Sequence, residues 1–167
     1  MKNIFLLFAF VCCSFASATA QQKLAHMNSG NILEKLPEVK QANKQLEAYQ
    51  KQLMAKGQTM SKQFQEKYQK YMQEGQSLTE TERNTREAGL QKEQEKISKY
   101  SQEVQTNLEK KRQVLLKPIL ERVDAIIKGV AKENGYSFVF DTSAGASLYS
   151  AQSDDISGLV KAKLGLK

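Results

Sequence analysis

The stretch EGQSLTETE, residues 74–82, divides the central part of this 167-residue chain into two halves. Gly75 can close a preceding helix by adopting a positive φ. Ser77 with Glu80, or Thr79 with Glu82, has the spacing of a capping box, in which a hydroxyl and a carboxylate satisfy free backbone N–H groups at a helix start. The stretch therefore predicts a turn between two helices, centred near residue 77.

The residues on both sides of this turn predict a coiled coil. Residues 34–133 are rich in Lys, Glu and Gln, which lose little side-chain freedom in a helix. Their apolar residues recur at intervals of three, four and seven, the spacing of one helical seam. The seam holds Ile32, Leu36, Val39, Leu46, Leu53, Met60, Phe64, Tyr68 and Tyr71, then Leu90, Ile97, Val104, Leu108, Leu115, Ile119, Val123, Ile126 and Val130. We expect gaps in it at Asn43, Gly57, Gln94 and Lys111.

The positions of the seam residues favour an antiparallel hairpin. Facing residues of such a hairpin lie equally far from the turn. With residue 77 as the centre, this holds within one position for Phe64 with Leu90, Leu53 with Tyr100, Leu46 with Leu108, Val39 with Leu115, and Ile32 with Val123. Each arm would have roughly 45 residues and a length of about 65 Å at 1.5 Å per residue.

The two ends of the chain predict a small body with β-strands. Residues 23–28, 136–140 and 146–150 have the alternation or the β-branched and aromatic content of short strands. Asn134-Gly135 is expected to end the second long helix, and Pro118 to kink it where the arm meets the body. Ser153-Asp154-Asp155 should cap a last helix, which we expect to bury Ile156, Leu159, Val160 and Leu164.

These elements define an α+β protein with two structural parts. Residues 34–115 form the coiled-coil hairpin arm, with its tip near 75–80, and residues 21–33 and 116–167 form the body. Three short strands and the helix ends make a core too small for a monomer of this length, so we expect a homo-oligomer that joins these sheets. The residues expected in this oligomer body are Leu24, Phe138, Phe140, Leu148, Tyr149 and Ile156.

The first 20 residues are typical of a cleaved export signal. Lys2 precedes an apolar run over residues 4–13, which is too short to span a bilayer comfortably, and Ala18-Thr19-Ala20 is a small-x-small cleavage pattern that leaves Gln21 first. Cleavage two residues earlier and an uncleaved anchor are the alternatives. Cys12 follows Val11 rather than a small residue, which disfavours lipid attachment. Removal of both cysteines with the signal leaves no thiol for a disulfide, a nucleophile or a metal.

The remaining chain offers little catalytic chemistry. His26 is the only histidine, it lies in the first predicted strand, and no nucleophile-elbow or Gly-rich phosphate loop is present. Asp154-Asp155 and the pair Glu80 and Glu82 are explained by the dipole at a helix start. We therefore expect no enzymatic activity, no cofactor and no metal.

Charge and exposed apolar residues suggest a binding role. Without Lys2 the chain has 24 basic and 18 acidic residues, and the arms carry most of this excess. A cationic protein attracts nucleic acid, anionic lipid or acidic polypeptides, and export argues against nucleic acid. Candidate binding residues are Met54, Met60, Phe64, Tyr68, Tyr71 and Met72, with Lys62, Lys67, Lys70, Lys110, Lys111 and Arg112. The alternative interpretation is a coiled-coil seam with a solvated charged face.

Several segments resemble the Skp/OmpH family of periplasmic chaperones. They are Lys23 to Asn28 with Ile32-Leu33, Leu116 to Leu120, Asn134 to Asp141, Leu148-Tyr149, and Asp155-Ile156-Ser157. Ser157 stands where the family pattern commonly has threonine. The resemblance implies a trimer whose hairpins enclose a cavity, and an ATP-independent holdase that keeps unfolded outer-membrane proteins soluble. Contact with anionic lipid or lipopolysaccharide stays open. A structural or adaptor protein of the envelope is the alternative function.

Overall fold

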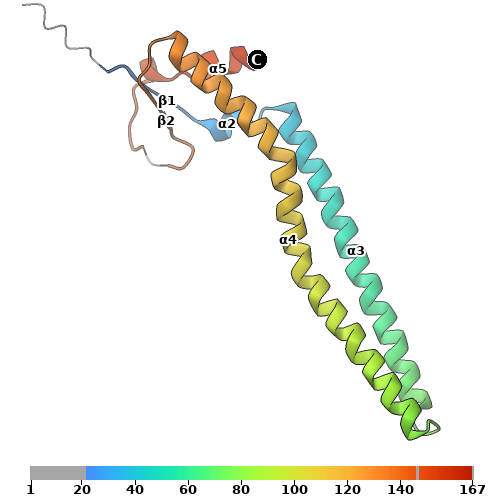
Figure 1. Ribbon diagram of the computed structural model, residues 1–167. Helices are drawn as coiled ribbons and strands as arrows, with labels where there is room; N and C mark the ends of the chain where they lie inside the picture. Colours follow the sequence, from blue (N-terminus) through green and yellow to red (C-terminus); the bar gives the residue numbers. More distant parts are fainter. Residues whose placement is uncertain (1–21, 146, 167) are drawn as a thin grey trace, which may run out of the picture.

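The computed structural model describes residues 22–145 and 147–166, so the predicted signal lies outside the described residues. The elements are β1 (Leu24–Met27), α2 (Ser29–Leu33), α3 (Pro37–Glu74), α4 (Glu80–Glu133), β2 (Phe138–Asp141), the 3₁₀ turn η2 (Gln152–Asp154) and α5 (Ser157–Lys163). Figure 1 shows α3 and α4 side by side as a long hairpin, with the other elements grouped at one end. The predicted α+β fold with a helical hairpin and a small β body is confirmed.

The turn of the hairpin lies where the sequence predicts it, and Thr79 rather than Ser77 begins the second helix. Thr79 Oγ1 accepts a hydrogen bond from the backbone N–H of Glu82, and the Glu82 carboxylate accepts one from the backbone N–H of Thr79 at 2.9 Å. This reciprocal pair is a complete capping box. The hydrogen bonds from Thr79 to the Glu82 carboxylate also lower the pKa of that side chain.

The positive φ expected at Gly75 is wrong. Gly75 has a φ of −57°, because the chain continues in a right-handed turn, with the Ser77 N–H donating to the carbonyl of Glu74 at 2.9 Å. Glycine instead avoids a close approach to the preceding turn. A Cβ at this position would lie 3.0 Å from the backbone oxygen of Tyr71.

Fewer residues are buried between the arms than the repeat predicts. In the two long helices only Ala42, Leu53, Tyr100, Val123 and Val130 are buried, and most other seam residues are half-buried. The four expected gaps separate into two groups. Gly57 and Lys111 are partly covered, whereas Asn43 and Gln94 are exposed and lie off the seam, which corrects their predicted place.

The second long helix runs through Pro118 to the body. Figure 1 shows α4 changing direction where it passes the start of α3, as expected for a helix that contains an internal proline. Gly135, with a φ of +72°, ends α4 as predicted. The N–H of Tyr136 donates to the carbonyl of Ala131 at 2.9 Å and the N–H of Gly135 to that of Lys132, which is the Schellman pattern.

The body packs a two-stranded sheet against the end of α4. β1 and β2 are parallel, with Leu24 opposite Phe138 and Met27 opposite Asp141. The core beneath them consists of Ala25, Met27, Ile32, Val130, Ile156 and Val160. Residue 155 adds a single bridge to His26 on the other side of β1.

Three expectations for the C-terminal segment are wrong. Residue 146 lies outside the described residues, and 147–150 form no strand, because no segment in the described part of the chain pairs with them. The last helix begins at Ser157 rather than after Asp155, whose carboxylate accepts a hydrogen bond from the Ser157 N–H at 2.7 Å. Ile156 and Val160 are buried as predicted, but Leu159 is 45% exposed, because it lies on the outer side of this short helix.

Candidate functional site

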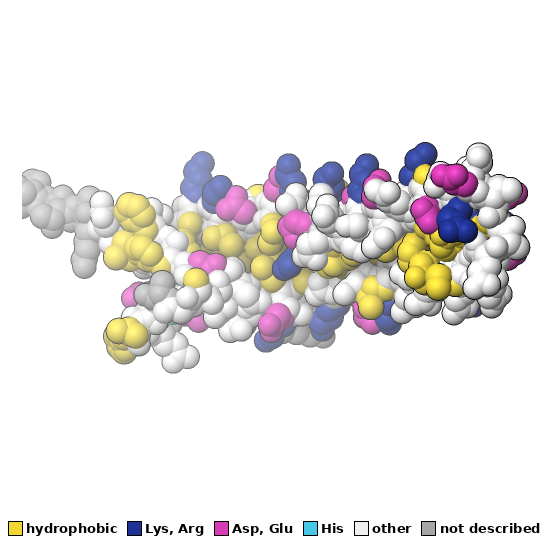
Figure 2. Space-filling view, turned by 90° about the horizontal axis from the view of Figure 1, so that it is seen from below, with side chains coloured by type: hydrophobic (Ala, Val, Ile, Leu, Met, Phe, Trp, Pro, Cys, Tyr) yellow, Lys and Arg dark blue, Asp and Glu magenta, His cyan; other side chains and the backbone are white. Residues whose placement is uncertain are grey.

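Of the candidate apolar residues on α3, some are half-buried in the seam and others are exposed to solvent. Met60, Phe64 and Tyr71 are half-buried against α4. Met54, Tyr68 and Met72 are 55%, 47% and 61% exposed. Phe64 and Tyr68 stack with their ring centroids 6.2 Å apart, so half-buried Phe64 and exposed Tyr68 share one apolar surface. Figure 2 shows hydrophobic side chains gathered at the far end of the hairpin, on the right, among charged groups.

This apolar surface remains open because the opposing helix supplies few apolar partners. The facing segment of α4 begins with charged and polar residues, and its first large aliphatic residue is Leu90, which is itself half-buried. Monomers rarely leave large contiguous apolar surfaces uncovered unless they serve in binding. Methionine and tyrosine side chains also adapt to partners of different shape.

Polar contacts join the arms along one side of the hairpin. Lys67 donates to Glu93 at 2.9 Å, and Arg122 donates to Glu38 at 2.8 Å. The hydrogen bond from Lys67 is the main cause of a lowered pKa at Glu93. Tyr71 donates its hydroxyl to Glu87, and this hydrogen bond raises the pKa of Tyr71. Most of these groups are exposed, so each pair contributes little stability but helps to fix which faces of the helices meet.

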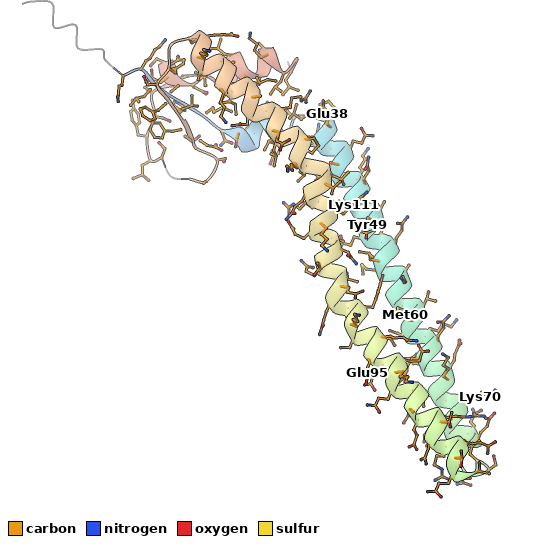
Figure 3. All side chains as sticks on the ribbon, in the orientation of Figure 1. Glu38, Tyr49, Met60, Lys70, Glu95 and Lys111 are labelled. Atoms are coloured by element: carbon orange, nitrogen blue, oxygen red, sulfur yellow. The ribbon has the colours of Figure 1, made fainter. Side chains whose placement is uncertain are left out.

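The six candidate cations do not form one site. Lys62, Lys67 and Lys70 lie in the outer part of α3, each within 4.0 Å of a glutamate carboxylate. Lys110 and Arg112 are exposed in the inner part of α4. Lys111 instead turns to the seam, with Nζ 5.9 Å from the centre of the Tyr49 ring, and Figure 3 shows these two residues together between the arms.

A small depression lies near the tip. It has a volume of about 250 Å³ and is lined by Lys67, Lys70, Tyr71, Arg86, Gly89, Leu90 and Glu93. Its cations already have acidic partners, because Lys67 pairs with Glu93 and Arg86 with Glu74. Among the described residues no group of histidine, cysteine or acidic side chains could hold a metal ion.

The body exposes a second apolar surface. Leu24, Phe138 and Phe140 are 47%, 53% and 56% exposed along the sheet, and Leu148 and Tyr149 project from the following loop. A cavity of about 590 Å³ lies between strand and loop, lined in part by Leu24, Phe140, Leu148 and Tyr149. Ile156 does not belong to this surface. It is 1% exposed and belongs to the core of the body instead.

Two contacts between the arms are not predicted by the sequence. The Tyr100 hydroxyl donates to the carbonyl of Leu53 at 2.9 Å, and the Lys56 ammonium lies 5.0 Å from the centre of the Tyr100 ring. The pairing of positions 53 and 100 was expected, but the specific hydrogen bond has no sequence signal. His26, which the sequence left without a role, donates from Nε2 to the carbonyl of Ala151 at 2.9 Å.

Comparison with known proteins identifies the family. A family model described as outer membrane protein (OmpH-like) matches residues 23–164. The chain belongs to the OmpH-like family. It is 32% identical to the protein named chaperone protein Skp of Yersinia enterocolitica over 84% of this chain and 85% of that protein. It is 29% identical to the protein of the same name from Pectobacterium atrosepticum over 87% of each chain.

A solved structure supports the same fold. The crystal structure of a putative outer membrane chaperone (OmpH-like) from Caulobacter crescentus matches with a TM-score of 0.73 and 16% identity, covering 88% of this chain and 86% of that one. The family resemblance inferred from the flanking segments is thus confirmed. In the described part of the chain, no helix has both the length and the apolar character needed to cross a bilayer.

Proposed function

We propose that this OmpH-like protein is a periplasmic, ATP-independent holdase chaperone that binds unfolded outer-membrane proteins and keeps them soluble for insertion. The observation that carries the proposal is the exposed apolar surface on the outer part of the hairpin. Tyr68 and Met72 lie near the tip of the hairpin and Met54 near its middle, and all three side chains are exposed. Relatives named chaperone protein Skp, about 30% identical over most of the chain, support this function.

Binding is proposed to rest on many weak contacts rather than on a tight pocket. Exposed methionine and tyrosine side chains contact apolar client residues, and the positive arms attract chains of opposite charge over longer range. Contacts that are individually weak release the client without nucleotide hydrolysis and together give high avidity. Binding by apolar contacts and charge attraction needs no catalytic group, cofactor or metal.

The functional unit is proposed to be a homotrimer joined through the body. Leu24, Phe138 and Phe140 are more than 45% exposed on a two-stranded sheet, and the edge of β2 has no partner strand among the described residues. An exposed strand edge beside aromatic side chains is a template for pairing with another chain. Leu148 and Tyr149 lie in the adjacent loop, where a second copy would cover them and allow residues 147–150 to become a strand.

The test is dilution of a urea-denatured β-barrel protein into buffer with and without this chain. We expect suppressed turbidity at a small molar excess, and a native mass of a trimer alone and of a trimer with one client. The substitutions Met54→Ser, Tyr68→Ser and Met72→Ser together should weaken suppression while leaving the trimer intact. The control pair Val114→Ser and Leu120→Ser removes exposed apolar side chains from the inner part of α4 and should have little effect. No suppression by the unmodified protein would favour a structural or adaptor role.

Contact with anionic lipid or lipopolysaccharide is proposed separately and needs an assay of its own. Lys110 and Arg112 are exposed in the inner part of α4 and supply positive charge for such a surface. Binding of the unmodified protein to vesicles with anionic lipid, but not to neutral vesicles, would establish it. We expect such binding to weaken with added salt, because exposed charges are screened within about 10 Å at 0.1 M.

A further inference from the structure

The four methionines among the described residues differ widely in their exposure to solvent. Met27 lies in the core of the body and is 1% exposed, and Met60 is half-buried against α4. Met54 and Met72 are 55% and 61% exposed. The two most accessible thioethers therefore belong to the exposed apolar residues of the hairpin on which the proposed function rests.

Met54 and Met72 occupy the same side of α3. They are 18 residues apart, which is five complete turns at 3.6 residues per turn and a rise of about 27 Å at 1.5 Å per residue. Tyr68, which is also exposed, lies about one turn before Met72 on this side. A chemical change at both methionines therefore alters one side of the helix along much of the arm.

Thioethers are the only sulfur groups of the chain beyond the predicted signal. Its two cysteines, Cys12 and Cys13, both lie within the signal. A two-electron oxidant that reaches the protein after removal of the signal meets no thiol, so methionine sulfur is its preferred target. Because oxidation follows exposure, Met54 and Met72 should react before Met60 and well before Met27.

We propose that Met54 and Met72 are modification sites, oxidised to methionine sulfoxide by hydrogen peroxide or a related two-electron oxidant, and that this modification weakens client binding. The inference rests on the proposed function. The sulfur lone pair attacks one oxygen of the peroxide, the O–O bond breaks, and the hydroxide that leaves takes the proton of the transferred hydroxyl group to form water. The sulfur is oxidised by two electrons, the peroxide is reduced, and the side chain gains one oxygen atom.

A sulfoxide changes what the hairpin offers to a client chain. The flexible apolar thioether becomes a polar group, and covering that group with apolar client residues costs free energy. Because Met54 and Met72 are more than half exposed, the added oxygen atoms meet solvent and the packing of α3 on α4 is kept. Burial protects Met27, so the core of the body is kept as well. Methionine sulfoxide reductases regenerate the thioether, which makes the loss of binding reversible.

The first measurement locates the modification. The full-length protein is treated with hydrogen peroxide for increasing times, catalase removes the remaining peroxide, and peptide mass mapping gives the oxidised fraction of each methionine. We expect Met54 and Met72 to react at least about tenfold faster than Met27, with Met60 between them. Urea-unfolded protein is the control, in which all of these methionines should react at similar rates. Equal rates at Met27 and Met54 in the folded protein would overturn the inference.

Leucine variants connect the modification to binding. Met54→Leu combined with Met72→Leu keeps apolar side chains of similar volume and removes both reactive sulfur atoms. Met60→Leu is the matched control, since Met60 lies on the same helix but is half-buried. Each variant is compared with its own untreated sample, so that the effect of the substitution itself cancels.

The readout is the affinity for a urea-denatured β-barrel protein, added after the peroxide is removed. Oxidation should weaken binding about fivefold in the protein without substitutions and in the Met60→Leu control, and less than about twofold in the double variant. Sulfoxide reductases should then restore binding. An equal loss in the double variant would overturn the inference, because the responsible group would lie elsewhere. So would a changed native mass after oxidation, because the modification would then act on assembly.

The untreated protein separates this result from the proposed function. If it fails to keep a denatured β-barrel protein soluble, the holdase function is wrong and the effect of oxidation on client binding is wrong with it. Peptide mapping still decides in that case whether Met54 and Met72 are the modified residues. If the untreated protein succeeds and the protein with both sulfoxides binds equally well, only the inference is wrong.

Discussion

Tyr100 of α4 donates its hydroxyl to the backbone carbonyl of Leu53 on α3, 2.9 Å away, and ties the two arms together midway along the hairpin. Both residues are buried, at 9% and 8% exposure, and no residue of the hairpin between Leu53 and Tyr100 is buried among those the structure describes. Gly57 lies beside the ring, and a Cβ there would be at ordinary contact distance from it, 3.5 Å. The hairpin thus has one well-packed layer at its middle and a loosely packed outer part.

Replacing Tyr100 with Phe should destabilise the hairpin by about 1 kcal/mol, the usual net value of one hydrogen bond. The ring would remain packed against Gly57, so only the hydroxyl contact with the Leu53 carbonyl is lost. Urea unfolding followed by helical circular dichroism measures the change. Tyr68→Phe is the control, because Tyr68 is exposed, and it should leave the midpoint unaltered. Equal effects of the two changes would contradict the role of the Tyr100 hydroxyl.

Replacing Gly57 with Ala should stabilise the protein by about 0.5–1 kcal/mol, since glycine is a poor helix former. The added methyl group reaches ordinary contact distance from Tyr100, 3.5 Å, so the seam need not move. Gly89→Ala, where nothing lies within 4 Å, should give a gain of propensity alone. Thermal unfolding of the two variants tests this. A loss of stability confined to Gly57→Ala would mean that the Tyr100 layer tolerates no added volume.

Local signals predicted the hairpin well, because its turn is determined within a few residues. The Thr79 and Glu82 pair marks the start of α4, and Gly135 marks its end with a positive φ. The polar contacts between the arms could be predicted only in part. On α3 they are made by residues spaced 7 or 11 positions apart, namely Glu38, Tyr49, Lys56, Lys67 and Glu74. Their partners on α4 depend on how the helices rotate, which follows from packing rather than from either helix alone.

The body was predicted less well, because its elements pair with segments that lie far along the chain. Residues 147–150 have strand-like composition but no neighbouring strand among the described residues, and they are irregular. Gly75 was assigned a positive φ from its type, although its role is to avoid the Tyr71 carbonyl. The candidate binding residues were chosen as a seam stripe, and only the three-dimensional packing separates exposed Met54 from half-buried Phe64.

Acid should loosen the body through Asp141. Burial raises the pKa of this carboxyl group, but hydrogen bonds from Ser29 and Ser143 outweigh it and hold the pKa below the ordinary value. The backbone N–H groups of Ser29 and Ser143 donate to it at 3.1 Å and 2.9 Å. A lowered pKa in the folded state contributes stability above the unfolded pKa of about 4, and this stability is lost as pH falls through the folded value.

The measurement for Asp141 is urea unfolding of the protein between pH 6 and pH 3. The variant Asp141→Asn should be less stable than the unmodified protein at pH 6 and should lose less stability on acidification. Asp154→Asn is the control, because Asp154 is exposed in η2. A variant at Asp141 that keeps the full pH dependence would assign the acid sensitivity to other carboxylates.

The outer part of the hairpin should open more readily than its base. Local opening free energy follows buried apolar contact, and residues 58–97 contain no buried side chain, whereas Val123 and Val130 in the inner part of α4 are 3% and 1% exposed. Hydrogen exchange detected by mass spectrometry should therefore be faster in 58–97 than in 123–130. Leu53→Ala should extend the fast region toward the body, because it removes a side chain that packs in the middle layer. Leu120→Ala is the matched control, since Leu120 is 46% exposed and its loss should leave the outer arm unchanged. Exchange in 58–97 as slow as in 123–130 would mean that the half-buried seam of Phe64, Tyr71 and Leu90 holds the tip as firmly as the core holds the base.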